Sequence, residues 1–262
     1  AATGGGPGHG CGAAGAGGMM PSGGMPGGGL PGGATAGVPG GPTSGPVGQE
    51  GNATDDAFQQ MRHLLAGRRQ LLGKLVGGRQ ASVGATEQGG NCRLALTALD
   101  GQGRDLVVCW MKDAGLNISV DQVGNIFGRR AGRNPALPPV MTGSHIDTQP
   151  TGGKFDGNYG VLAGLEVARS LNDAGVETVA PIEVAVWTNE EGSRFVPVMM
   201  GSGVFAGAFT LEHALAQRDA QGISVGEALA AIGYAGSPGA TPDVGAYFEA
   251  HIEQGPVLEA NN

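Results

Sequence analysis

Positive charge is scarce in this 262-residue sequence, which has 15 Lys and Arg against 23 Asp and Glu and a formal net charge of −8. Nucleic-acid binding requires clustered Lys and Arg, so the composition excludes that class of partner. Long apolar runs are also absent, and none approaches the ~18 residues that a membrane-spanning helix needs. No Lys or Arg precedes Arg62, which argues against a signal peptide or a transit peptide.

Cysteine is rare as well. Cys11, Cys92 and Cys109 are odd in number and irregularly spaced, so they predict neither a disulfide framework nor a CxxC zinc site. We therefore expect a reducing, cytoplasmic setting. Because the chain begins with Ala1 rather than Met, we also expect a fragment or a processed form.

Glycine and proline are abundant, with 53 Gly and 16 Pro in the chain. Residues 1–50 contain 21 Gly and 7 Pro, and Glu50 is their only charged residue. Such a segment cannot bury enough apolar area to offset its chain entropy. We predict a disordered segment over residues 1–53 and a folded domain over residues 54–262.

Hydrophobic periodicity in residues 54–262 alternates between helix and strand patterns. Apolar residues at three- and four-residue steps predict a first helix that begins after Thr54 and reaches Leu75. Strands that alternate with helices are typical of an α/β fold with helices on both faces of a sheet. The sequence predicts further helices at 101–114, 159–174, 210–219 and 224–232, and strands at 117–121, 125–129, 139–143, 182–188 (a central strand) and 247–253.

Three clusters of polar residues follow predicted strands. GSHID (143–147) follows PVMTG, NEEGSRF (189–195) follows IEVAVWT, and HIEQG (251–255) ends YFEA. In open α/β sheets, ligands bind beyond the carboxyl ends of the strands. The sequence therefore predicts that these three clusters converge on one site.

The first cluster contains His145, which together with Asp156 offers an imidazole nitrogen and a carboxylate oxygen. This pair suits Zn²⁺ or a similar first-row metal ion. Asp147 is placed to accept the other ring N–H of His145 and to fix its tautomer. The structural alternative is a buried histidine bonded to the backbone, with aspartates that cap the next helix.

The other clusters add two carboxylates and a second histidine. Glu190 and Glu191 are adjacent and repel each other unless a cation or a shared proton intervenes, although a solvated turn explains the pair equally well. On a strand, His251 and Glu253 share one face, so His251 could complete the metal's ligands or could be a satisfied core histidine. Gln254 is a candidate substrate contact. The remaining histidines, His9, His63 and His213, are interpreted as surface residues.

Together, GSHIDTQPTGGKFDGNYGVLAGLEV, WTNEEGSRF and FEAHIEQGPVLE resemble segments of the N-carbamoyl-L-amino-acid hydrolases and yeast-type β-ureidopropionases. These are dinuclear metal amidohydrolases of the M20 peptidase-like superfamily. GATEQGGNCRLALT (84–97) and GNIFGRRAG (124–132) match too, so the likeness runs from about residue 84 to 262. It implies a three-layer α/β catalytic domain whose mixed sheet is flanked by helices.

The resemblance also implies roles for individual residues. His145 and His251 would bind metal together with Asp156, the bridging carboxylate, and Glu191 would bind the second ion with Asp156. Glu190 would be the general base, and Asp147 would support catalysis through His145. The bond between Asp156 and Gly157 would be a cis peptide.

The cofactors implied are two divalent metal ions, with zinc first and manganese, cobalt or nickel as alternatives. The implied small-molecule substrate is an N-carbamoyl-L-amino acid or N-carbamoyl-β-alanine, which yields the amino acid, CO₂ and NH₃. In the family, a lid and dimerisation domain and a further histidine ligand follow the HIEQG segment. We expect them to be absent here, which predicts an incomplete catalytic domain, low activity and no homodimer of the family's type.

Three alternatives stay open. The chain could be an allantoate amidohydrolase, because those enzymes share the EEGSRF and HIEQG segments. It could be a non-catalytic metal-binding fragment. The polar clusters could also be only helix caps and turns, which predicts no stoichiometric metal.

Overall fold

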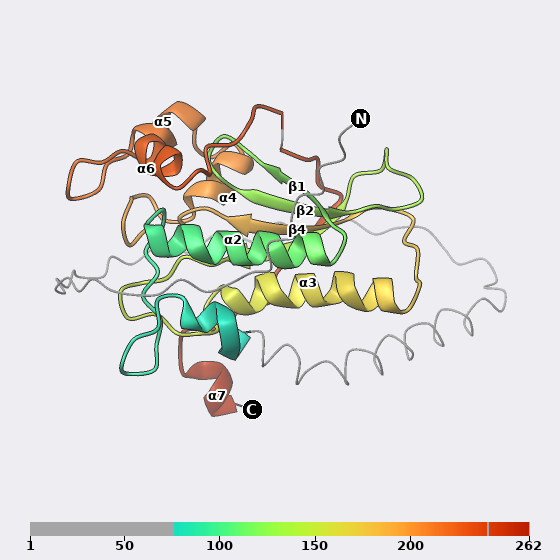
Figure 1. Ribbon diagram of the computed structural model, residues 1–262, viewed down its shortest axis with the longest axis horizontal. Coiled ribbons are helices and arrows are strands. Elements are labelled where there is room, and N and C mark those ends of the chain that lie inside the picture. Colours follow the sequence, from blue (N-terminus) through green and yellow to red (C-terminus); the bar gives the residue numbers. More distant parts are fainter. Residues whose placement is uncertain (1–75, 240, 262) are drawn as a thin grey trace, which may run out of the picture. The chain divides into compact units, whose positions relative to one another are not determined.

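The computed structural model describes residues 76–239 and 241–261. The predicted disordered segment 1–53, the predicted helix from Thr54 to Leu75, His9 and His63 all lie outside the described residues. All the elements described below belong to the compact unit Leu65–Asn262, and Figure 1 shows their arrangement.

A five-stranded mixed sheet forms the centre of this unit. The strands occur in the order β1-β2-β4-β3-β5, with β1 antiparallel to β2, β2 antiparallel to β4, and β4, β3 and β5 mutually parallel. The predicted mixed α/β sheet is therefore confirmed, and the apolar run IEVAVW is its central strand. The strands are β1 (Asn117–Val120), β2 (Ile126–Arg130), β3 (Val140–His145), β4 (Ile182–Trp187) and β5 (Ala246–Phe248).

Two long helices begin and end at residues that the sequence marks. The Thr97 side chain caps α2 by accepting a hydrogen bond from the backbone N–H of Asp100, so α2 begins three residues before its predicted start. Gly115 and Gly175 follow α2 and α3 with φ of 77° and 64°, where glycine meets no steric cost. The helices are α2 (Ala98–Asp113), α3 (Asn158–Asp173), α4 (Met200–Phe205), α5 (Leu211–Ala216), α6 (Val225–Ala231) and α7 (Val257–Asn261), preceded by a π-helical turn, η1 (Val76–Gln80).

Helices flank the sheet on both faces, as predicted (Figure 1). On one face, α2 and α3 bury fully inaccessible residues such as Val107, Met111 and Leu165 against β-strand side chains that include Ile126. On the other face, Phe205 of α4 packs against the rings of Phe127 and Trp187. Burial of this apolar area is the main stabilising contribution to the fold.

One prediction about the elements is wrong, and two short helices were missed. The strand predicted at 247–253 ends at Phe248, because its pairing with β3 covers only the partners Val140 to Thr142. His251 and Glu253 therefore do not lie on a strand. The short helices α4 and α7 were not predicted, since neither segment has enough residues for a helical period to be read.

Candidate metal centre

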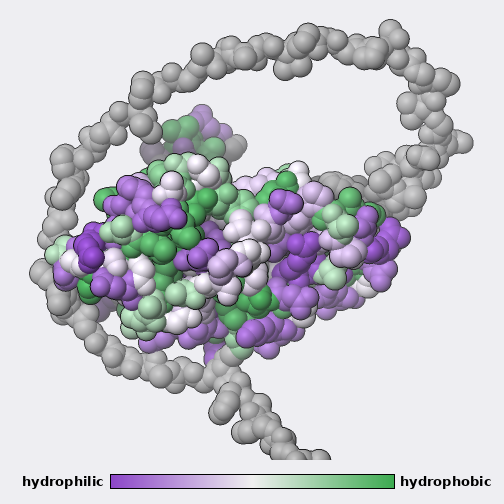
Figure 2. All heavy atoms as spheres, turned by 90° about the horizontal axis from the view of Figure 1, so that it is seen from above, coloured by the Kyte–Doolittle hydropathy of each residue, from purple (hydrophilic) through white to green (hydrophobic). Residues whose placement is uncertain are grey.

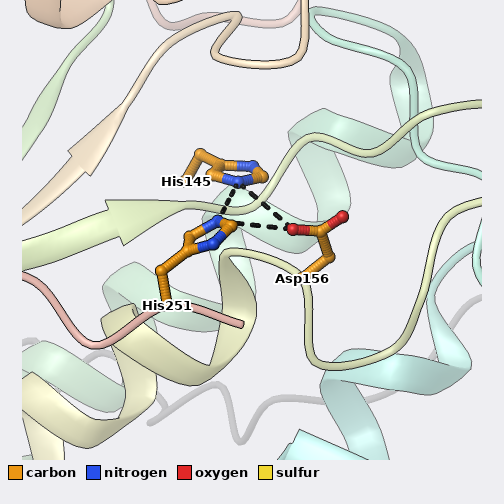
Figure 3. A group of neighbouring side chains, drawn as sticks. All are labelled: His145, Asp156 and His251. Carbon is orange, nitrogen blue, oxygen red and sulfur yellow. Dashed lines mark hydrogen bonds and ion pairs between the residues drawn. The ribbon is translucent and has the colours of Figure 1, made fainter. Parts of the chain in front are cut away.

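His145, Asp156 and His251 come from three separate segments and meet at one point (Figure 3). His145 is the last residue of β3, Asp156 lies in the loop before α3, and His251 follows β5. One ligand atom from each residue lies within 4.8 Å of the other two. The Nε2 atoms of His145 and His251 lie 3.8 Å and 3.3 Å from Asp156 Oδ1. The predicted convergence of the first and third clusters is thus present in the structure.

The hydrogen bonds of the two histidines assign their tautomers. His145 Nδ1 lies 2.9 Å from the backbone carbonyl oxygen of Asp147, and His251 Nδ1 lies 2.7 Å from that of Ile252. A carbonyl oxygen only accepts, so each Nδ1 carries the proton and each neutral ring directs a lone pair from Nε2. The two Nε2 atoms are 3.2 Å apart. Facing lone pairs repel, so a cation, either a proton or a metal ion, fits between them.

Asp156 supplies a third unshared electron pair at the same point. Its Oδ1 is buried and has no hydrogen-bond donor among the described residues, whereas Oδ2 accepts from the side-chain amide of Gln254. Two imidazole nitrogens and a carboxylate oxygen form a donor set that suits Zn²⁺ and related first-row ions. Gln254 therefore contacts a candidate metal ligand, and its role in substrate binding stays a prediction.

Asp147 differs from its predicted role. Its carboxylate Oδ1 is 3.9 Å from His145 Nδ1, so the ring N–H donates to the backbone carbonyl of the same residue instead. The two carboxylate oxygens accept the backbone N–H groups of Glu190 and Glu191, each at 3.2 Å. Asp147 thereby joins the end of β3 to the turn that follows β4, and positions the glutamate pair.

The glutamate pair lies beside the histidines. Glu190 Oε2 is 3.3 Å from His145 Nε2, and Glu191 Oε2 accepts a hydrogen bond of 3.0 Å from Gln149. Glu191 Oε1 is buried, and no hydrogen-bond partner for it occurs in the described part of the chain. Burial raises the pKa of Glu191 to about 7, with the nearby Asp156 carboxylate acting in the same direction. A second cation would relieve this cost.

Burial also acts on His145 and Asp147. By itself, burial lowers the pKa of His145, but the carboxylates of Asp147 and Glu190 outweigh it, so the net shift is upward. Burial raises the pKa of the Asp147 carboxyl. Concentrated negative charge around His145 therefore favours a bound cation.

The predicted cis peptide between Asp156 and Gly157 is wrong. Among the described residues, the cis peptide is Val196–Pro197. The chain turns after Asp156 through the positive φ of Gly157, 62°, instead. This turn brings the Gly157 backbone against the His145 ring.

The sequence reasoning missed a group of residues that joins three strand ends. Ser144 donates to Glu249 Oε1 at 2.5 Å, Tyr247 donates to Glu249 Oε2 at 2.7 Å, and Trp187 donates to Tyr247 at 2.8 Å. Ser144 immediately precedes His145, and Glu249 lies two residues before His251. The signal that could have revealed the group is the position of each member at or just beyond the end of a strand.

A cavity of about 490 Å³ lies beside the metal centre. Glu190 and His251 contribute to its wall, and the described residues that line it include no Lys or Arg. The cavity thus offers apolar surface next to the candidate catalytic groups. Its lining consists of Met141, Trp187, Glu190, Met199, Ser202, Phe205, Ala206, Val244, Tyr247, Glu249 and His251.

Comparison with known families gives a match to this same region. Residues 141–262 match the model of peptidase family M20/M25/M40. This part of the chain is an M20-family domain. The match includes His145, Asp156, Glu190, Glu191 and His251.

Named proteins and solved structures are similar to a larger part of the chain, which includes the M20-family domain. It is 54% identical over 187 residues to an N-carbamoyl-L-amino-acid amidohydrolase of Rhizobium meliloti, covering 70% of this chain and 44% of that protein. A hydantoinase/carbamoylase family amidase from Burkholderia ambifaria is 57% identical, with a TM-score of 0.71 over 73% of this chain and 47% of that one. An allantoate amidohydrolase of Bacillus subtilis is less similar, at 37% identity over 68% of this chain and 44% of that protein. The chain spans about half the length of the relatives it matches.

None of the helices in the described ranges combines the length and the apolar character that crossing a membrane requires.

Proposed function

We propose that the protein is a metal-dependent hydrolase of linear amide or ureido C–N bonds, with N-carbamoyl-L-amino acids or N-carbamoyl-β-alanine as substrates. The observation that carries the proposal is the convergence of His145 Nε2, His251 Nε2 and Asp156 Oδ1, each with an unshared electron pair. The names of the relatives with 54% and 57% identity support the carbamoyl substrate class.

Two divalent ions fit the donor atoms that the described residues present. His145, Asp156 and His251 would hold the first ion, and Glu191 would hold the second together with Asp156. The buried oxygens Asp156 Oδ1 and Glu191 Oε1, which have no hydrogen-bond donor among the described residues, support this assignment. Mixed nitrogen and oxygen donors favour Zn²⁺, and Mn²⁺, Co²⁺ and Ni²⁺ accept the same donors.

When bound, the ions would polarise the ureido carbonyl and lower the pKa of the attacking water. Glu190 takes the role of general base, because its side chain is 24% exposed and therefore accessible, and its carboxylate lies 3.3 Å from His145 Nε2. Glu190 accepts a proton as the water oxygen bonds to the ureido carbon, and returns it to the nitrogen as the C–N bond breaks. The products are the amino acid and carbamic acid, which divides into CO₂ and NH₃.

The first experiment measures metal content. We expect the purified chain to hold stoichiometric divalent metal by elemental analysis, and Asp156→Asn to lose most of it because an amide replaces the shared carboxylate. His213→Ala is the matched control, since His213 is an exposed histidine on α5, and it should retain the metal. If the unsubstituted chain contained no metal, the result would support the alternative that the polar clusters are only helix caps and turns.

A substrate panel then tests the reaction. N-carbamoyl-L-amino acids should be turned over faster than allantoate, and Glu190→Gln should lower kcat by about 10²- to 10⁴-fold. Equal turnover of an N-acetyl amino acid would contradict the carbamoyl assignment. Bound metal without turnover, also in a protein of the relatives' length, would favour a non-catalytic metal-binding protein. The same purified protein tests by light scattering whether the family's homodimer forms.

A further inference from the structure

Arg93 is a fully buried cation that the proposed reaction does not use. Its side chain lies in the segment before α2, and the residue has 0% exposure. Burial lowers the pKa of its guanidinium to about 10. A buried charge is costly unless it is fully hydrogen-bonded, so the bonds of Arg93 indicate what the group stabilises.

The guanidinium holds two segments that carry candidate metal ligands. Arg93 Nε donates to the carbonyl oxygen of Ile146 at 2.8 Å, and Nη2 donates to Asn158 Oδ1 at 2.8 Å. Ile146 directly follows His145 in the sequence, and Asn158 lies two residues after Asp156. One rigid group therefore spans the end of β3 and the start of α3.

The remaining donors of Arg93 bond the segment before it in the chain, and its backbone bonds Thr148. Nη1 donates to the carbonyl oxygens of Gln80 and Val83, at 3.0 Å and 2.8 Å. The backbone of Arg93 also exchanges hydrogen bonds with Thr148, since its N–H donates to Thr148 Oγ1 at 2.7 Å and its carbonyl accepts from Thr148 N at 2.9 Å. Arg93 is thus held on several sides, and it is rigid enough to hold its partners.

Its charge acts on the centre as well. The carboxylates of Asp147 and Asp100 lie near enough to Arg93 to favour its charged form. Asp147 accepts the N–H groups of Glu190 and Glu191. Arg93 therefore also supports the residue that positions the glutamate pair.

We propose that Arg93 is a positioning residue of the metal centre, which sets the distance between His145 and Asp156 by bonding Ile146 and Asn158 at the same time. The proposal rests on the proposed function, because it takes His145 and Asp156 as metal ligands. Lysine cannot replace Arg93 in this role, since an ammonium group lacks the planar fork that reaches several acceptors in fixed directions.

The test compares Arg93→Lys with Arg104→Lys in the full 262-residue chain. Arg104 is the matched control because it too has 0% exposure and donates to buried acceptors, Asp100, Gly124 and Thr188, without bonding either ligand segment. Co²⁺ binding is measured by calorimetry and by the visible absorption of bound Co²⁺, under conditions where urea unfolding shows each variant folded. Arg93→Lys should raise the Kd for Co²⁺ by about 10- to 100-fold and change the spectrum. Arg104→Lys should leave both close to those of the unsubstituted chain.

A second variant covers the outcome in which Arg93→Lys does not fold. Asn158→Ala removes the bond between Arg93 and the Asp156 segment, together with a longer bond of 3.2 Å from Asn158 Nδ2 to the carbonyl oxygen of Lys154. It should also raise the Kd for Co²⁺. If the folded Arg93→Lys or Asn158→Ala variant kept the Kd and spectrum of the unsubstituted chain, the role of Arg93 would be overturned but the metal centre would stand. An effect of Arg104→Lys equal to that of Arg93→Lys would have the same consequence. Failure of the unsubstituted chain to bind Co²⁺ would overturn the metal centre itself, and the role of Arg93 with it.

Discussion

The orientation of the His145 ring depends on a residue with no side chain. A Cβ placed at Gly157 would lie 2.5 Å from the Cδ2, Cε1 and Nε2 atoms of His145, far inside van der Waals contact. Gly157 also has a φ of 62°, which disfavours residues other than glycine. The close contact places the backbone that follows Asp156 directly on the imidazole that we propose as its partner in metal binding.

Gly157→Ala should therefore displace the His145 ring and weaken metal binding. We expect the Kd for Co²⁺ to rise by about tenfold or more, because the added methyl group occupies space that the ring now fills. Gly153→Ala is the control, since a Cβ at Gly153 meets no atom within 4 Å. A Kd that is unchanged in Gly157→Ala, or equally raised in both variants, would contradict this account.

Among the strands, β4 contains a carboxylate in its buried interior. Glu183 is 2% exposed, and its Oε2 lies 3.5 Å from Arg129 Nη1 on the neighbouring strand β2. Burial raises the pKa of Glu183 above its usual 4.5, although Arg129 acts in the opposite direction. The sheet therefore retains a proton on Glu183 at pH values where the unfolded chain has released it.

This difference makes the stability of the sheet depend on pH. Because the folded chain binds the proton more tightly, the contribution of Glu183 to the free energy of unfolding is greatest below about pH 4.5 and falls as pH rises through the folded pKa. Glu183→Gln removes this titration. In urea unfolding from about pH 4.5 upward, the unsubstituted chain should lose more stability than Glu183→Gln.

Glu177→Gln serves as the reference for this comparison, because Glu177 is exposed in the loop after α3. Its unfolding free energy should follow that of the unsubstituted chain across the same pH range. Parallel pH profiles of the unfolding free energy for the unsubstituted chain and Glu183→Gln would show that burial does not raise the pKa of Glu183.

In the Leu65–Asn262 unit, apolar surface is exposed to solvent on the side of the sheet where α4 lies. Figure 2 views the structure from that side and shows apolar side chains between polar ones. The cavity of about 490 Å³ lies under this surface, and Met199 at its rim is 56% exposed. Accessible apolar cavities of this kind bind apolar molecules.

The dye ANS, which fluoresces on apolar surface, should therefore bind to the folded chain. Met199→Asn should reduce the fluorescence by about half or more, because it places an amide at the rim of the cavity. Asn also suits the positive φ of Met199, 54°. Val179→Asn is the matched control, since Val179 is 53% exposed and does not line the cavity. Equal fluorescence from the two variants would locate the dye elsewhere.

Much of the α/β architecture could be predicted because it depends on local patterns. The apolar run of β4 matches a strand buried on both faces, and Gly115 and Gly175 mark the ends of their helices through backbone freedom alone. The position of His145 at the end of β3 and of Glu190 just after β4 could be predicted for the same reason, since parallel strands bring their carboxyl ends to one edge.

Other features depend on contacts between segments far apart in the chain, and no local pattern encodes those contacts. The length of β5 follows from how much of β3 is available for pairing. The Asp147 carboxylate binds the turn after β4 rather than the His145 ring. The packing places the backbone carbonyl oxygen of Asp147 2.9 Å from His145 Nδ1 and its carboxylate Oδ1 3.9 Å away. Arg93 is an ordinary polar residue in the sequence, and only the tertiary structure brings its guanidinium into hydrogen bonds with Ile146 and Asn158, beside the candidate metal ligands. Residue types and their order thus indicate the chemistry, while three-dimensional packing assigns each side chain its partner.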